Sequence, residues 1–207
     1  NWREEEQKPS LQTWESEAFP IMAKTAVKIA FIIVSILLLV YLLLPGSDSI
    51  TDFPALPDSI KSSLEGDTIQ VPNVSAYFSN NYRDFVIPYY DQSYKGDTGV
   101  PFGPLRLNYP PEFAFTAIKD QTQSTYLEEF VYPLKDSLFI NGLEPVEKDG
   151  SPRYVGGGRF EIDGRFIDTK VTLRFYPSTV PVKIAVWFGI NLSAIALFIM
   201  SKRIFSK

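Results

Sequence analysis

Residues 21–44 read IMAKTAVKIAFIIVSILLLVYLLL, and this apolar run decides the architecture of the chain. Lys24 and Lys28 are its only charged residues, so residues 29–44 carry no charge. A helix that crosses a bilayer needs about 20 mostly apolar residues. Residues 26–44 meet this length because the long Lys28 side chain can place its ammonium group among the lipid headgroups. The run therefore predicts a transmembrane helix.

A second run, VPVKIAVWFGINLSAIALFIM at residues 180–200, repeats the pattern near the other end of the chain. A domain of this size has little room for two helices that are apolar on all sides, so buried core helices are the weaker interpretation. A cleavable signal peptide fits the first run poorly, because an acid-rich segment precedes it and no small-x-small cleavage site follows it. We expect a membrane protein with transmembrane helices at 21–44 and 181–201 that flank an α+β domain at 45–180.

Basic residues near the ends of membrane spans mark the cytoplasmic side. Those before the first span are Arg3, Lys8, Lys24 and Lys28. Those after the second span are Lys202, Arg203 and Lys207. Between them, the first basic residue after residue 44 is Lys61. The sequence thus predicts cytoplasmic tails at 1–20 and 202–207 and an extracytoplasmic domain, in a two-pass protein of the plasma membrane.

Charge divides the chain in the same way. Residues 45–180 carry 19 acidic and 12 basic residues, whereas the rest of the chain carries 5 acidic and 8 basic residues. An acidic outer domain without a basic stripe argues against nucleic acid as a partner. Small secreted animal domains usually contain disulfides, and this chain has no cysteine, which favours a prokaryotic envelope.

The clearest local signal in the domain is a C-terminal β-hairpin. Residues 159–162 and 170–175 alternate in polarity, and Asp163-Gly164 between them suits a turn with positive φ. The pattern Thr125-x-x-Glu128 followed by apolar residues at helical spacing predicts a helix to residue 138, kinked at Pro133. We also expect helices at 57–64, at 79–87 and from Pro110-Pro111-Glu112 onward, a strand at 68–71 and a long loop at 91–109.

The chemistry available to the chain is limited, because it contains neither histidine nor cysteine. Serine–histidine triads, cysteine nucleophiles and ordinary zinc sites are therefore excluded within this chain. A mechanism with two carboxylates is the form of catalysis that stays open. Glu128 and Glu129 are adjacent acids, but on the expected helix they point about 100° apart and are solvated surface charges. The sequence predicts no catalytic residue, no metal site and no cofactor.

Aromatic residues make up 14% of the chain, and eight tyrosines lie between residues 77 and 132. Tyrosine combines apolar area with a polar tip, which suits protein interfaces and stacking on sugars. A phenylalanine core with tyrosine at its rim, or tyrosine at the membrane interface, explains the same composition. The candidate surface for a protein partner or a glycan consists of Tyr82, Tyr89, Tyr90 and Tyr94.

Polar and small residues also occur inside the expected spans. Ser35 and Asn191 lie at the midpoints of residues 26–44 and 182–200, so antiparallel helices would bring them to the same depth. Hydrogen bonds in such places contribute roughly 0.5–2 kcal/mol. Gly189 and Ser193 add a seam of small residues. We expect Ser35, Gly189, Asn191 and Ser193 to form a helix–helix contact, within the chain or with another subunit.

Together these patterns predict a non-enzymatic, membrane-anchored structural or accessory subunit of a multi-protein cell-envelope complex. Its partners would be the lipid bilayer and other membrane or envelope proteins, a second copy of the chain included. Two flanking spans, with Pro177 and Pro181 ahead of the second, are similar to the topology of bacterial polysaccharide co-polymerases, which control chain length. A glycan-binding or polysaccharide chain-length-control protein is therefore the alternative. The resemblance covers topology and the two prolines, and the long helical hairpin expected of that family is missing from the sequence.

Overall fold

The computed structural model describes residues 11–65, 67, 71–96, 98–118 and 123–205, with side chains from Lys24 onward. The chain divides into two compact units. One unit holds the helical segments up to Tyr41 and from Trp187, and the other comprises Leu42–Val186. The second boundary falls inside a helix, so the first turns of that helix belong with the domain.

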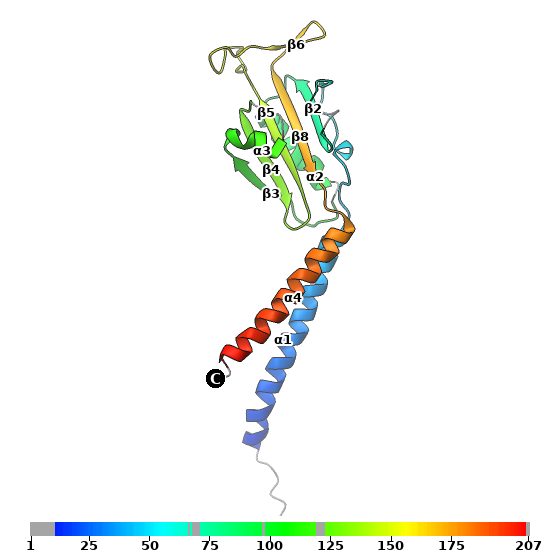
Figure 1. Ribbon diagram of the computed structural model, residues 1–207, viewed down its shortest axis with the longest axis vertical. Helices are drawn as coiled ribbons and strands as arrows, with labels where there is room; N and C mark the ends of the chain where they lie inside the picture. The colour runs from blue at the N-terminus through cyan, green and yellow to red at the C-terminus, as the bar shows by residue number, and fades with distance from the viewer. Residues whose placement is uncertain (1–10, 66, 68–70, 97, 119–122, 206–207) are drawn as a thin grey trace, which may run out of the picture. The chain divides into compact units, whose positions relative to one another are not determined.

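Two long helices, α1 (Leu11–Leu43) and α4 (Val180–Phe205), are long and apolar enough to cross a membrane (Figure 1). From Lys24 onward, most of their side chains are exposed in the isolated chain and very few are buried. Lys202 and Arg203 lie in the last turn of α4, where positive charge interacts favourably with the helix dipole. Two helices compatible with membrane spans therefore flank a sheet-rich domain, as the sequence predicts.

The domain is built on a six-stranded antiparallel sheet with the strand order β1-β2-β8-β5-β4-β3 (Figure 1). The strands are β1 (Ile60–Lys61), β2 (Val74–Ser79), β3 (Leu105–Tyr109), β4 (Tyr126–Tyr132), β5 (Asp136–Leu143) and β8 (Thr169–Tyr176). The short 3-10 helices are η1 (Ile50–Asp52) and η2 (Pro111–Phe113), and the domain's α-helices are α2 (Arg83–Gly96) and α3 (Ala114–Ile118).

The two domain helices pack on opposite faces of this sheet. On one face the ring of Tyr94, from α2, lies 5.1 Å from the ring of Tyr132 on β4. On the other face Ala114 and Ile118, the first and last residues of α3, form a buried cluster with Leu127. Leu127 and Tyr132 stand an odd number of positions apart on one strand, so they point to opposite faces. The sheet is thus the middle layer of the domain, and its central strands are buried on both sides.

The helix expected from Thr125 to residue 138 is wrong. This segment forms the hairpin of β4 and β5, in which Tyr132 pairs with Asp136. The chain turns at Pro133 and Leu134, where Leu134 has a φ of 63°. Because the strands are buried on both faces, apolar residues occur at successive positions, and some fall at helical spacing by coincidence.

Other elements differ in part from the expectation. The region 57–64 holds a turn and strand β1 instead of a helix, and the expected loop 91–109 contains the end of α2 and strand β3. Helix α2 continues past Pro88, which lies inside it. The helical start at Pro110-Pro111-Glu112 is confirmed by η2 and α3. The strand expected at 68–71 lies outside the described residues except for Val71.

The C-terminal hairpin is confirmed at its turn, but the second strand expected at 170–175 is not part of it. Strand β6 (Phe160–Ile162) pairs with β7 (Arg165–Ile167) through Asp163 and Gly164, whose φ values are 51° and 72°. Two central residues at positive φ fit a two-residue hairpin turn. The expected partner strand is β8, which instead lies in the main sheet between β2 and β5. Residues 165–167 complete the hairpin instead.

Candidate functional site

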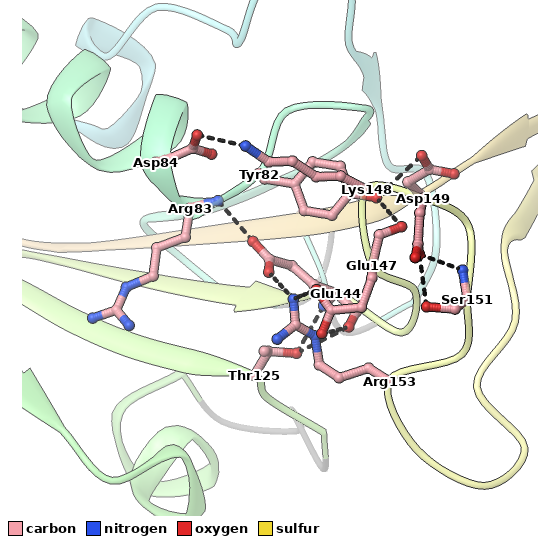
Figure 2. A network of polar contacts seen from close by, with 11 residues as sticks. Tyr82, Arg83, Asp84, Thr125, Glu144, Glu147, Lys148, Asp149, Ser151 and Arg153 are labelled. Carbon is pink, nitrogen blue, oxygen red and sulfur yellow. Dashed lines mark hydrogen bonds and ion pairs between the residues drawn. The ribbon is translucent and has the colours of Figure 1, made fainter.

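A cleft of about 820 Å³ opens between the start of α2 and the loop that follows β5 (Figure 2). We call it the charged cleft, because four basic and four acidic side chains line it. The basic residues are Arg83, Arg106, Lys148 and Arg153. The acidic residues are Asp84, Glu144, Glu147 and Asp149.

Two of the cleft's arginines bind a buried carboxylate, Glu128. The Glu128 side chain is fully buried, and Arg83 Nη2 lies 2.6 Å from its Oε1. Arg106 binds the same carboxylate through Nε and also through Nη2, which lies 2.9 Å from Oε1. The side chains of Arg83 and Arg106 stay 43% and 53% exposed. Glu128 was expected to be a solvated helix cap, but β4 points it under α2, where it joins α2, β3 and β4.

Glu144 anchors the start of α2 to the loop after β5. Its Oε1 accepts a hydrogen bond of 2.7 Å from the backbone N–H of Arg83, where the positive end of the helix dipole favours a carboxylate. Arg153 Nη2 donates to Glu144 at 3.0 Å and to Glu147 at 3.1 Å (Figure 2). Burial nevertheless raises the pKa of Glu144 above its usual value. The charge of this carboxylate is therefore stabilised less well than it would be in water.

Tyr82 is engaged at both its hydroxyl tip and its ring. The hydroxyl lies 3.0 Å from the carbonyl oxygen of Glu147 and 3.2 Å from the carboxylate of Asp168. Burial, together with the charge of Asp168, raises the pKa of Tyr82 to about 12. The ammonium group of Lys148 lies 5.7 Å from the centre of the ring and also pairs with Asp84 at 2.6 Å. Tyr82 is therefore a structural contact and not a free platform for a sugar.

The chemistry of the charged cleft follows from these pairings. All four acids that line it already accept hydrogen bonds, Asp149 from Ser151 and the other three from the basic residues and the backbone. In the part of the chain that the structure describes, no three acidic, histidine or cysteine side chains gather where they could hold a metal ion. The cleft is thus a network of paired charges that fixes the loop to α2.

The tyrosines predicted as a surface separate into two groups. Tyr90 and Tyr94 are 0% and 1% exposed, so they belong to the core and cannot contact a partner. The physical reason is their spacing of four residues, which places both on the face of α2 that packs against the sheet. Tyr89 is half-buried and donates a hydrogen bond of 2.8 Å to the carbonyl of Ala55. Its ring stacks on the exposed Phe85 at 5.8 Å, with 19° between the ring planes.

A second, apolar cleft of about 530 Å³ lies on the α3 face of the sheet. It is lined by residues of η2, α3 and four strands, among them Phe113 and Tyr109. Large apolar side chains stand exposed around it and on the adjacent edge strand β3. We call these four residues the apolar surface: Leu105 (57% exposed), Leu107 (41%), Phe113 (55%) and Phe115 (64%). Sequence reasoning missed it by assigning 91–109 to a loop, although the alternation of Leu105, Leu107 and Tyr109 is a strand signal.

The helical unit tests the contact expected between the spans. Trp187 Nε1 donates a hydrogen bond of 2.9 Å to the backbone carbonyl of Ser35, so Ser35 does lie where α1 and α4 meet. Asn191 does not bind Ser35 and instead donates to the carbonyl of Trp187, one turn back in its own helix. Gly189 and Ser193 are exposed, and a Cβ added at Gly189 would meet nothing within 4 Å. The small-residue seam is therefore not the contact within the chain, and its contact with another subunit stays a prediction.

Comparison of the chain with protein-family models, with curated proteins and with solved structures finds no match.

Proposed function

We propose that this protein is a non-enzymatic, membrane-anchored subunit of a multi-protein complex of the cell envelope. The apolar surface carries the proposal. It exposes four large apolar side chains on neighbouring elements of the domain, beside an apolar cleft. Exposed apolar patches mark interaction sites on soluble domains, because leaving them in water is unfavourable unless a partner covers them.

The membrane topology belongs to the same proposal. The basic residues outside the two spans support cytoplasmic termini and an outer domain, and the acidic charge of residues 45–180 suits a domain that does not dock on anionic headgroups. The absence of disulfides supports a prokaryotic plasma membrane. Cysteine accessibility to a membrane-impermeant thiol reagent tests this topology. Labelling of Val155→Cys and protection of Ser201→Cys in intact cells would support it, and the reverse pattern would overturn it.

A binding role is also favoured by the state of the charged cleft. A general acid or base must be free to exchange a proton with a substrate. The carboxylates of Glu144 and Glu147 share Arg153, and Glu128 lies beneath two guanidinium groups. These groups are arranged to hold the domain together, which leaves the apolar surface as the part of the molecule suited to a partner.

Site-specific photo-crosslinking tests the proposal in the full-length protein in its native membrane. A photoreactive amino acid at Phe113 should give a discrete protein adduct. The matched control is Val155, which is fully exposed and lies in the glycine-rich loop between β5 and β6. If both positions gave the same diffuse adducts, or Phe113 gave none, the apolar surface would not be a partner site.

One observation favours a second candidate, glycan binding. Phe85 and Tyr89 form a nearly parallel pair of rings, and the Phe85 ring is 43% exposed. Stacked aromatic side chains of this kind are suited to the apolar face of a sugar. Retention of the full-length protein on immobilised envelope polysaccharide, weakened by Phe85→Ala but not by Tyr154→Ala, would support this function. Equal retention of both variants would remove it.

A further inference from the structure

We propose that the partner at the apolar surface is a second copy of this chain, joined to the first by antiparallel pairing of β3 with β3. This inference rests on the proposed function, because it names the partner of the same surface. The result would be one continuous sheet that runs through two domains related by a two-fold axis. In such an isologous contact the same residues of both copies meet.

Strand β3 has the properties that such pairing needs. It lies at the edge of the sheet, and among the described strands β4 is its only neighbour. Leu105 to Asn108 are exposed, and Tyr109 is half-buried. The outer side of an edge strand presents a row of backbone N–H and C=O groups to a second strand. The opposite edge is less suited, because β1 contains two residues, Ile60 and Lys61.

The sequence around β3 fixes the register of the pair. Pro104 and Pro110 border the strand, and neither has an N–H to donate to a neighbouring strand. Leu107 is the middle one of the five residues between them, so a pair that uses the whole segment places the two-fold axis at Leu107. Leu105 of each copy then lies opposite Tyr109 of the other, and Arg106 lies opposite Asn108.

Side-chain chemistry selects this register over its neighbours. Centring the pair on Leu107 brings apolar side chains together on the α3 face, where Leu105 and Leu107 are otherwise exposed. Centring it on Arg106 would place two arginines directly opposite each other, which is unfavourable. Centring it on Asn108 would place Pro110 opposite Arg106, where it removes a ladder hydrogen bond. The strand carries no acid, and its single charge is paired with Glu128 of its own copy.

The helical unit offers a second surface suited to self-association. Gly189 and Ser193 are exposed on α4 and face away from the contact with α1 that Trp187 makes. Small residues four positions apart let two helices approach closely in a membrane. Copies anchored in the same bilayer also meet at high effective concentration, which strengthens a contact that is weak on its own.

Cysteine crosslinking tests the register directly, because the chain has no cysteine of its own. In the full-length protein in native membranes, mild oxidation of Leu107→Cys should yield a covalent dimer, since the two cysteines lie opposite each other across the axis. Leu105→Cys alone should yield little dimer, because its two copies stand four positions, roughly 13 Å, apart along the strands. Differently tagged Leu105→Cys and Tyr109→Cys, expressed together, should yield the mixed dimer. Val155→Cys serves as the exposed control.

The outcomes separate this inference from the proposed function. If Leu107→Cys formed no more dimer than Val155→Cys, the second copy would be excluded at this edge. If the photoreactive group at Phe113 then still captured a different protein, the proposed function would stand without the second copy. If Phe113 captured no protein, both the inference and the proposed function would fail. A charge variant gives an independent readout, because Leu107→Lys should halve the particle mass in mild detergent. Leu64, which is 52% exposed at another place on the domain, provides the control, and Leu64→Lys should leave the mass unchanged. An unchanged mass for Leu107→Lys would also overturn the inference.

Discussion

Replacing Glu128 by glutamine tests whether the buried carboxylate holds the domain together. The change keeps the side chain's shape but removes the negative charge beneath Arg83 and Arg106. Removing one partner of a fully buried ion pair costs about 3–5 kcal/mol, mostly because the other charge stays buried without compensation. Here the two arginine side chains are 43% and 53% exposed, so their charges can regain water. We therefore expect a loss of about 2–3 kcal/mol in the free energy of unfolding.

For a domain of this size, that loss corresponds to a fall in Tm of roughly 4–12 °C. Thermal unfolding of the full-length protein in mild detergent, followed by the near-ultraviolet circular dichroism of its tyrosines, measures the shift. Asp84→Asn is the matched control, because the Asp84–Lys148 pair has a similar distance of 2.6 Å but both side chains are more than 60% exposed. Exposed pairs contribute at most about 1 kcal/mol. If Glu128→Gln lowered Tm no more than Asp84→Asn, burial of the ion pair would not be the source of its strength.

Three further changes have defined outcomes. Gly142→Ala should destabilise the domain by about 1–3 kcal/mol, because the added Cβ would lie 2.1 Å from ring atoms of the buried Tyr126. Gly158→Ala is the control: its added Cβ meets no atom within 4 Å, so the variant should be neutral in the same thermal unfolding experiment. Leu134→Gly should raise stability by about 0.5–1 kcal/mol, because it relieves a left-handed backbone at an exposed side chain; a decrease would contradict the turn geometry. Tyr82 and Tyr109 should both ionise near pH 12. For Tyr109 the cause is the hydrogen bond that it donates to Glu129. Tyr82→Phe and Tyr109→Phe should each remove one late step from the tyrosinate absorbance titration. Since both folded-state pKa values lie above the usual value of about 10, their contribution to stability is complete below pH 10 and is lost as the pH rises towards 12.

The features that sequence could predict are those that depend on local length and local backbone preference. The two candidate membrane helices follow from long runs of apolar residues, and α1 and α4 occupy these runs. The turn at Asp163 and Gly164 follows from two residues that tolerate positive φ. Neither prediction requires knowledge of which segments meet in space.

The features that sequence could not predict depend on the pairing of distant segments. Strand β8 alternates as expected, but nothing in its own residues shows that it pairs with β2 and β5 and leaves β7 to complete the hairpin. The apolar residues of β4 face two different layers, so their spacing imitates a helix. Tyr90 and Tyr94 could not be separated from Tyr89 until the face of α2 that packs on the sheet was known.

The same limit applies to Glu128 and Glu129. On a helix both would be solvated surface charges, but on β4 they point to opposite faces. Glu128 binds two arginines on the α2 face, and Glu129 accepts a hydrogen bond of 2.6 Å from Tyr109 on the α3 face. Their roles therefore depend on strand register and not on their position in the chain.

The ion pair at Glu128 bears directly on the proposed dimer. Natural edge strands avoid unwanted pairing by carrying charged side chains that hold water at the edge. Arg106 is the one charge on β3, and Glu128, which also binds Arg83, pairs with it and holds it against the α2 face. On its other face β3 carries the side chains of Leu105, Leu107 and Tyr109 and no charge, so the edge can pair with a second strand. Releasing Arg106 by Glu128→Gln should therefore weaken the Leu107→Cys crosslink at temperatures where the domain is still folded, whereas Gly142→Ala, which also destabilises the domain, should not.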